Sequence, residues 1–366
     1  MIQKVSLSNF KCFEKMECEL KNVNILTGLN GMGKSTVIQS LLLLRQSSES
    51  GKASNLKLNG EYVKLGIGRD VLYEKAVREE IEFMLEYTGG KSRYVYEYDT
   101  KSDEQILIDS DVKGTEKCPV YAERFTYLSA FRIEPQKIYG MTNKANIQRH
   151  AWGNNGEFSL QYLKEYGSDD VVNSHIFRNN MDDPAPKSIA NQVNEWLQMI
   201  SPDVRVNIEM DQLMNRSELR FEFVEGENTT NLYKCINVGF GLTYVLPIII
   251  ALVSAECGDI VILENPEAHI HPKGQRMLGE LIARAGASGA QIIVETHSDH
   301  ILNGVRLAVK HHCIAKEQVE LIYFYKDQED GYRHKCEIPH ILDNGKIDHW
   351  PEGFFDEWEN ALLDLV

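Results

Sequence analysis

The stretch Gly28-Leu29-Asn30-Gly31-Met32-Gly33-Lys34-Ser35-Thr36 decides the fold. It reads G-x-x-x-x-G-K-S, the pattern of a phosphate-binding loop. The glycines let backbone N–H groups converge on phosphate oxygens, and a helix that follows would present its positive N-terminal end to the same anion. Lys34 would reach the β- and γ-phosphates of a nucleotide, and the Ser35 hydroxyl would bind Mg²⁺. We therefore predict that the residues from Asn30 to Thr36 bind a nucleotide.

The residues on both sides of the loop supply the structural context that this motif requires. Val23 to Thr27 reads as a strand, and Thr36 to Leu44 reads as a buried helix. The alternative interpretation is a tight strand-to-helix turn with a chance lysine. The strand–loop–helix order favours the phosphate loop over that alternative.

The composition bounds the class of protein. With 366 residues the chain could hold one large or two ordinary domains, and a hydrophobic content of 43% is ample for a core. No apolar run approaches the ~20 residues that a membrane span needs. The net charge of −15 disfavours a protein whose whole surface grips DNA, although it leaves a local basic patch open.

The cysteines and the start of the chain indicate a cytoplasmic location. The seven cysteines are scattered and show no C-x-x-C pair, which suggests reduced thiols. The first five residues alternate like a strand, and we see no signal-peptide pattern there.

A second group of candidate residues follows an apolar strand. The run from Ile260 to Leu263 suits a central parallel strand, and Glu264-Asn265-Pro266-Glu267 follows it. In open α/β sheets the ligand lies at the carboxyl ends of such strands. Glu264 is therefore placed to hold Mg²⁺ directly or through water, and Glu267 to activate water as a base. The alternative is a capping cluster at the end of a strand.

Two further segments point to the same chemistry. The strand from Gln291 to Val294 leads to His297, which would contact the γ-phosphate or the attacking water. Gly239-Phe240-Gly241-Leu242-Thr243 precedes an apolar helix and is a second candidate for binding an anion at a helix N-terminus. Two such termini in one chain suggest a nucleotide held between two copies.

Other segments are predicted from their patterns alone. A hairpin is expected at Glu80–Tyr87 and Arg93–Tyr98, and a strand at Phe125–Ala130. Arg132, just after that strand, would either reach a phosphate or be a plain surface charge. Helical spacing occurs at Ser159–Tyr166 and Ser188–Ile200, short strands are expected at Val204–Met210 and Leu219–Val224, and a loop at Met181–Pro186.

The motifs, taken in this order, resemble those of the ABC-type ATPases of the SMC, RecF and OLD (overcoming lysogenization defect) group. The order is the phosphate loop, Gly-Phe-Gly-Leu-Thr, Ile-Leu-Glu-Asn-Pro-Glu-Ala-His-Ile-His-Pro and Glu-Thr-His-Ser-Asp-His. Phe10-Lys11-Cys12-Phe13 is similar to the opening strand motif of that group. Residues 343–355 look like a terminal domain of unknown function on standalone AAA-labelled ATPases of bacteria.

The resemblance implies an α/β fold, a P-loop NTPase of the ABC/SMC-head type. A mixed sheet core would carry a β-rich N-terminal lobe and an inserted helical subdomain. We expect one ABC-type ATPase domain over 1–366. Its parts would be a β-rich lobe insertion at 46–125, a mainly helical insertion at 137–235, a Walker B and switch-histidine core at 236–325, and a C-terminal extension at 326–366.

The resemblance also implies a role for each motif. The segment from Gly28 to Thr36 matches the Walker A loop, and Gly239, Gly241 and Thr243 match the signature segment that acts in trans. Glu264 occupies the Walker B position, and His297 matches the switch histidine. Residues 129–136 lie where the family has its Q-loop, and 269–272 where the D-loop would be.

One departure from the family concerns catalysis. Many relatives end the Walker B strand with two acids, and the second acid is the catalytic base. Here Asn265 stands in that place. An amide orients water but cannot accept its proton at neutral pH. Either Glu267 takes over, or hydrolysis is slow and the protein works as an ATP-bound switch.

The function implied is an ATPase that uses ATP and Mg²⁺, dimerises head to tail around them, and regulates a separate effector such as a nuclease or toxin. Anti-phage or mobile-element defence is the setting that the resemblance implies, with nucleic acid left open and no membrane partner. Relatives often carry a C-terminal nuclease, which we do not expect here. One alternative is a RecF-like DNA-repair clamp with a basic groove from Arg132, Lys137, Lys144 and Arg149. The other is a non-enzymatic scaffold stabilised by nucleotide.

Overall fold

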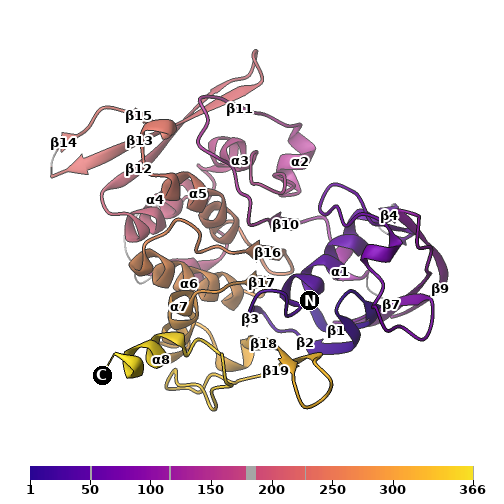
Figure 1. The fold of residues 1–366 in the computed structure, drawn as a ribbon. Coiled ribbons are helices and arrows are strands. Elements are labelled where there is room, and N and C mark those ends of the chain that lie inside the picture. Colours follow the sequence, from indigo (N-terminus) through magenta and orange to yellow (C-terminus); the bar gives the residue numbers. More distant parts are fainter. Residues whose placement is uncertain (50–51, 115–116, 179–186, 227, 366) are drawn as a thin grey trace. The chain divides into compact units, whose positions relative to one another are not determined.

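The computed structural model describes residues 1–49, 52–114, 117–178, 187–226 and 228–365. Their backbone divides into two compact units. Unit 1 consists of Met1–Glu123, Val319–Ile341 and Ile347–Val366, and unit 2 consists of Arg124–Gln318 and Leu342–Lys346. The loop predicted at Met181–Pro186 lies outside the described residues. Figure 1 shows the elements of both units, coloured along the chain.

Unit 1 contains an antiparallel sheet in the strand order β2-β1-β7-β8-β9-β6. The predicted hairpin is confirmed as β7 and β8, with Glu80 opposite Glu97 and Tyr87 opposite Gly90. Alternate residues of β7 are buried, as expected for a strand with one face on a core. The strands are β1 (Ile2–Phe10), β2 (Phe13–Glu19), β6 (Leu56–Lys57), β7 (Glu80–Tyr87), β8 (Gly90–Glu97) and β9 (Glu104–Gly114).

The remaining elements of unit 1 carry the phosphate loop. Strand β3 (Val23–Gly28) pairs in parallel with β18 (Val319–Asp327), which pairs in the antiparallel sense with β19 (Arg333–Glu337). Residues Val23 to Thr27 of β3 are all buried, so both faces of this strand are covered. Helix α1 (Lys34–Gln46) follows the loop directly. Smaller elements are β4 (Ser48–Glu49), β5 (Lys52–Ala53), α8 (Glu357–Asp364) and two 3₁₀ turns (Gly68–Asp70 and Pro119–Tyr121).

Unit 2 is built on three parallel strands and the helices around them. Strand β16 (Ile260–Glu264) pairs with β10 (Phe125–Leu128) on one side and with β17 (Gln291–Glu295) on the other. Helix α5 is apolar and buried along almost its whole length from Leu242 onward, so it packs as a core helix. The helices are α2 (Lys144–Gln148), α3 (Ser159–Tyr166), α4 (Ile189–Ile200), α5 (Phe240–Val253), α6 (Pro272–Ala287) and α7 (Asp299–Lys310), with 3₁₀ turns at Ser174–Ile176, Cys235–Asn237 and Lys316–Gln318.

The segment 137–235 differs from its predicted character. It contains α2, α3 and α4, but it also contains a small antiparallel sheet, which Figure 1 shows as a long hairpin beside α4 and α5. The segment is therefore mixed rather than mainly helical, because the two predicted short strands extend and pair with each other. Its strands are β11 (Tyr139–Gly140), β12 (Val204–Asp211), β13 (Arg216–Glu225), β14 (Asn228–Thr229) and β15 (Tyr233–Lys234).

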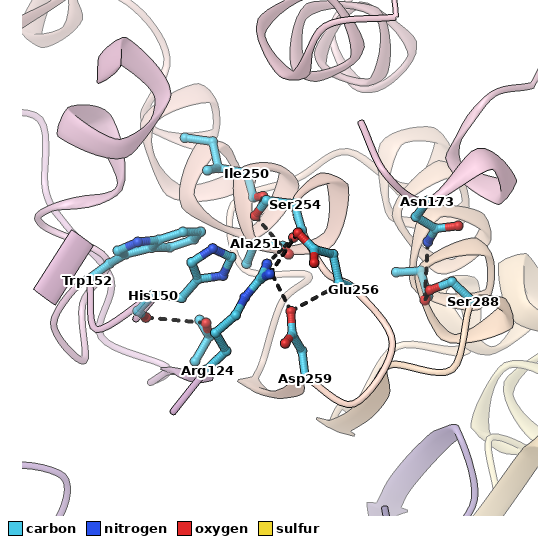
Figure 2. Close-up of polar contacts among 12 residues, drawn as sticks. Arg124, His150, Trp152, Asn173, Ile250, Ala251, Ser254, Glu256, Asp259 and Ser288 are labelled. Atoms are coloured by element: carbon cyan, nitrogen blue, oxygen red, sulfur yellow. Dashed lines mark hydrogen bonds and ion pairs between the residues drawn. The ribbon is translucent and has the colours of Figure 1, made fainter. Parts of the chain in front are cut away.

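A partly buried polar cluster ties the amino end of β10 to the C-terminal end of α5. Figure 2 shows the Arg124 guanidinium between Glu256 and Asp259, at 2.7 Å and 3.1 Å from their carboxylate oxygens. The same guanidinium donates a hydrogen bond to the carbonyl of Ser254 at 2.9 Å. The His150 ring lies beside Trp152, with ring centroids 4.8 Å apart. These contacts fix the amino edge of the three-stranded core, opposite to the strand ends that carry the candidate residues.

None of the helices in the described part of the chain is both long and apolar enough to cross a membrane.

Candidate functional site

The phosphate loop in unit 1 has the backbone that its glycines allow. Gly28, Gly31 and Gly33 have φ angles of +132°, +78° and +111°, in the region that side chains disfavour. A β-carbon on Gly28 would lie 2.2 Å from the carbonyl oxygen of Phe324 in β18. One on Gly33 would lie 2.4 Å from the ring of Phe13. The loop is therefore held by close approach on its inner side, while Leu29, Asn30 and Gly31 are exposed at its tip.

Lys34 folds back over this loop. Its side chain is buried, and its Nζ donates hydrogen bonds to the carbonyl oxygens of Gly28 at 2.8 Å and Leu29 at 3.0 Å. Helix α1 begins at Lys34, and its N-cap residue, Gly33, has no side chain to cap the helix N-terminus. A buried ammonium group and an uncapped helix N-terminus meet at one loop, which is the arrangement that a phosphate group fits.

Two residues for which the sequence predicted no role at the site, Phe13 and His334, lie beside the loop. The Phe13 ring lies under Gly33 and 6.1 Å from the His334 ring. A ring nitrogen of His334 lies 3.2 Å from the carbonyl oxygen of Gly31. Cys12 Sγ is 3.6 Å from the hydroxyl of Thr36. The turn after β1 and the start of β19 thus support the loop, and only the resemblance of Phe10–Phe13 to a family motif hinted at this.

In unit 2 the two candidate strands end side by side. The register of β16 and β17 places Glu264 opposite Glu295. Burial raises the pKa of Glu264 to about 7, and the nearby Glu295 carboxylate adds to the rise. Hydrogen bonds from the Tyr127 hydroxyl and from the Ala130 backbone to this carboxyl oppose the rise. A buried carboxyl with such a pKa becomes an oxygen ligand once a cation stabilises its charged form.

Glu267 is engaged on both of its carboxylate oxygens. One oxygen accepts a hydrogen bond from the Thr296 hydroxyl at 2.8 Å, and the other accepts one from the backbone N–H of His297 at 2.8 Å. The side chain of His297 is exposed. Glu267 therefore links the loop after β16 to the end of β17 and fixes the backbone at the predicted switch histidine.

Asn265 occupies a strained turn between these carboxylates. Its φ is +44°, in the left-handed region that asparagine tolerates better than most residues. Its backbone N–H donates to the carbonyl of Glu295 at 2.8 Å. Its side-chain Oδ1 is buried and has no hydrogen-bond partner among the described residues.

Arg132 is not a surface charge, which was one of its two predicted roles. The residue is only 2% exposed, and its guanidinium donates to the carbonyls of Ser129 (3.0 Å), Glu264 (2.7 Å) and Asn265 (2.6 Å). Burial lowers its pKa to about 10. The prediction of a surface charge was wrong because the short segment after β10 turns inward, which the local sequence does not reveal. The prediction of a phosphate contact gains no support, since both terminal nitrogens already donate to backbone carbonyls.

The predicted signature segment forms the start of α5. The helix begins at Phe240, with Gly239 as its N-cap and without a side-chain cap. A β-carbon on Gly241 would lie 2.4 Å from the carbonyl of His269, so this helix end packs closely on the loop after Glu267. Thr243 is buried, and its hydroxyl has no hydrogen-bond partner in the part of the chain that is described. Gly239 and Phe240 are exposed at the helix end.

The structure thus gathers the predicted residues into two groups. Those of the phosphate loop, from Asn30 to Thr36, lie in unit 1, and Glu264, Glu267, His297 and the signature segment lie in unit 2.

Comparisons with known proteins assign the chain to a family and a fold. Residues 23–303 match a family described as "AAA domain, putative AbiEii toxin, Type IV TA system", and residues 314–365 match a family of proteins of unknown function, DUF3696. The second match confirms the terminal domain that the resemblance predicted. Among curated proteins, the OLD nuclease of Thermus scotoductus is 20% identical over 389 residues, which span 99% of this chain and 70% of that protein.

The similar solved structures are heads of Smc proteins, and they show the fold. An Smc head bound to the C-terminal winged-helix domain of ScpA has a TM-score of 0.55 at 14% identity, covering 93% of this chain and 98% of that one. An Smc head with an extended coiled coil, bound to the C-terminal domain of ScpA from Pyrococcus furiosus, has a TM-score of 0.51 at 13% identity, covering 100% and 99%. The predicted α/β P-loop fold of the SMC-head type is confirmed. The chain belongs to the AAA-domain family described as putative AbiEii toxin, Type IV TA system; it is similar in sequence to an OLD nuclease and in fold to Smc heads.

Proposed function

We propose that this protein binds ATP with Mg²⁺, hydrolyses it slowly, and dimerises head to tail around it to regulate a separate effector. The observation that carries the proposal is the loop at Gly28–Thr36, with its left-handed glycines and the buried Lys34 ammonium over its carbonyls. In this proposal, residues 1–366 work as one ABC-type ATPase domain.

The nucleotide and the metal would be held by groups of different kinds. Backbone N–H groups from Asn30 to Thr36 and the Lys34 ammonium suit the phosphates, and the Ser35 hydroxyl and the Glu264 carboxylate suit Mg²⁺. The bound ion would supply positive charge at the β- and γ-phosphate oxygens. The raised pKa of Glu264 supports this assignment. Burial destabilises the charged form of this carboxyl, and a bound cation would stabilise that form again.

For hydrolysis we propose that the Glu264 carboxylate acts beside the γ-phosphate and that Glu267 holds His297 in position. Both oxygens of Glu267 accept hydrogen bonds, from the Thr296 hydroxyl and the His297 N–H, which suits a positioning role better than that of a free base. Asn265 stands where relatives carry the base, and its amide cannot take a proton from water. Turnover should therefore be slow.

The test compares phosphate release by the wild type, Glu264→Gln and Glu267→Gln, with ATP affinity measured for each. We expect Glu264→Gln to lower the rate by about 100-fold and Glu267→Gln by about tenfold, since only the first removes a group at the reacting end. A greater loss in Glu267→Gln than in Glu264→Gln would reverse the two roles. A wild type that retains ATP without releasing phosphate would favour the scaffold alternative.

In the proposed dimer, the start of α5 with Gly239, Gly241 and Thr243 faces the γ-phosphate bound by the other copy; Gly239 is exposed at this helix end, whereas Thr243 is buried behind it. The family's description as a toxin–antitoxin component supports a defence setting, and the Smc heads that bind ScpA support a separate protein partner. The scattered free cysteines support a cytoplasmic location. Light scattering with and without a non-hydrolysable ATP analogue tests the dimer, and an unchanged mass would contradict it.

One of the four residues proposed for the basic groove of the DNA-clamp alternative is not available to bind DNA. That alternative needed Arg132 in a basic groove, and that side chain is buried and bonded to backbone carbonyls. We therefore retain the effector model as the single proposal.

A further inference from the structure

The Arg132 side chain holds together the segment after β10 and the end of β16. Its two terminal nitrogens donate to the carbonyls of Ser129 after β10, and of Glu264 and Asn265 at the end of β16. Three neutral carbonyl acceptors converge on one buried guanidinium. A planar fork of donors matches such a set, whereas the ammonium of lysine is a point donor.

The guanidinium also contacts the start of α5. Its central carbon lies 5.8 Å from the centre of the Tyr244 ring, within the range of a cation–π contact. Tyr244 follows Thr243 of the signature segment, and its ring packs edge-on against His269 at 4.8 Å. One side chain therefore touches both the helix whose N-terminus is the proposed trans contact and the strand end that carries Glu264.

We propose that Arg132 is a positioning residue that couples the signature helix to the carboxylate end of β16. This inference rests on the proposed function. Arg132 holds the carbonyls of Glu264 and Asn265 in place, so the left-handed turn at Asn265 keeps one geometry. When a partner's nucleotide engages the start of α5, any movement of Tyr244 reaches the Glu264 backbone through this contact. The Glu264 carboxylate then takes the position needed for ATP hydrolysis only in the dimer.

The coupling predicts a split between binding and turnover. None of the three acceptors of Arg132 belongs to the phosphate loop, so the affinity of the monomer for ATP, measured at a protein concentration too low for the dimer, should not depend on this residue. The rate of phosphate release and the ATP-dependent dimer should both depend on it. A residue that only stabilised the fold would lower the melting temperature without separating these readouts.

The experiment uses the full chain and a double-mutant cycle of Arg132→Lys and Tyr244→Leu. We expect each variant to lower kcat by about tenfold with Kd for ATP unchanged, and the double variant to lose no more than either single variant. Tyr244→Phe keeps the ring and should lose less than Tyr244→Leu. Arg205→Lys, an exposed arginine of the same unit, is the matched control with unchanged turnover.

The outcomes of the cycle either support or overturn the coupling between Arg132 and Tyr244. Effects of Arg132→Lys and Tyr244→Leu that multiply, or a Kd that weakens along with kcat, overturn the coupling. If Arg132→Lys does not fold, the contrast between Tyr244→Leu and Tyr244→Phe still tests it, and equal rates in these two variants overturn it. If the wild type binds ATP without hydrolysing it, the fraction of ATP-dependent dimer is measured for each variant in place of kcat. A wild type that binds no ATP refutes the proposed function and this inference with it, whereas active Arg132 and Tyr244 variants refute this inference alone.

Discussion

The phosphate loop of unit 1 and the strand ends of unit 2 are built by different means. The loop is made of backbone: three glycines have positive φ, of which Gly31 lies at the exposed tip, and Lys34 is bonded to the loop's own carbonyls. The strand ends are made of side chains from distant segments, as when Glu267 bonds to Thr296 and His297, or Arg132 to the carbonyl of Glu264. The residues proposed to bind the nucleotide are therefore close together in the sequence, whereas those proposed to act in hydrolysis come from distant segments.

The largest test of this contrast is Lys34→Ala. Removing the ammonium leaves the proposed β- and γ-phosphates without their charged donor, so ATP affinity should fall at least about 100-fold, which corresponds to about 2.7 kcal/mol. Titration calorimetry with an ATP analogue measures it. The matched control is Lys15→Ala, an exposed lysine of the same unit, which should bind as the wild type does. Equal affinity in Lys34→Ala and wild type would show that the loop is not the binding group.

A second test asks whether the loop depends on backbone conformation alone or also on close packing. Gly31 and Gly33 both have positive φ, but a β-carbon meets nothing within 4 Å at Gly31 and meets the Phe13 ring at 2.4 Å at Gly33. Gly33→Ala should destabilise the protein by about 2–4 kcal/mol and Gly31→Ala by about 1 kcal/mol. Urea unfolding measures both. Equal losses would mean that Phe13 yields and that packing beneath the loop is unimportant.

A third and smaller effect concerns pH and the amino edge of the unit 2 core. Burial lowers the pKa of His150 to about 3, so the unfolded chain takes up a proton below about pH 6.5 that the folded chain refuses. Stability should fall from about pH 6.5 toward pH 3, by at most about 1.4 kcal/mol per pH unit. Burial raises the pKa of Asp259 to about 6, so between about pH 4 and pH 6 the folded chain holds a proton that the unfolded chain has lost. This contribution to the stability of the folded chain is present below about pH 4 and is lost as pH rises to about 6, so its pH dependence is opposite to that of His150.

His150→Asn separates the two contributions, because asparagine tolerates the left-handed backbone of His150 and does not titrate. The free energy of unfolding of the wild type should fall toward that of the variant as pH falls from 7 to 5, because only the wild type has a buried imidazole to protonate. His312→Asn is the matched control for the replacement itself, since His312 is also left-handed but exposed. A constant difference between wild type and His150→Asn would contradict a buried neutral imidazole.

The sequence by itself determined the phosphate loop, the order of the motifs and, through them, the family. Those signals are local: a glycine pattern that selects a backbone, and apolar runs such as Ile260–Leu263 that end in polar residues. The periodic hairpin at β7 and β8 was predictable for the same reason. Each depends on residues within one or two turns or strands of each other.

Only the tertiary structure decided what the charged groups at the strand ends do. Arg132 looked like a surface or phosphate contact, and it is buried because carbonyls more than a hundred positions away accept its hydrogen bonds. Glu267 looked like a free base, and residues after β17 take both of its oxygens. The place of Phe13 beneath Gly33 also depends on chain segments brought together by folding. A side chain's role follows from its partners, and a sequence pattern reports partners only when they are close along the chain.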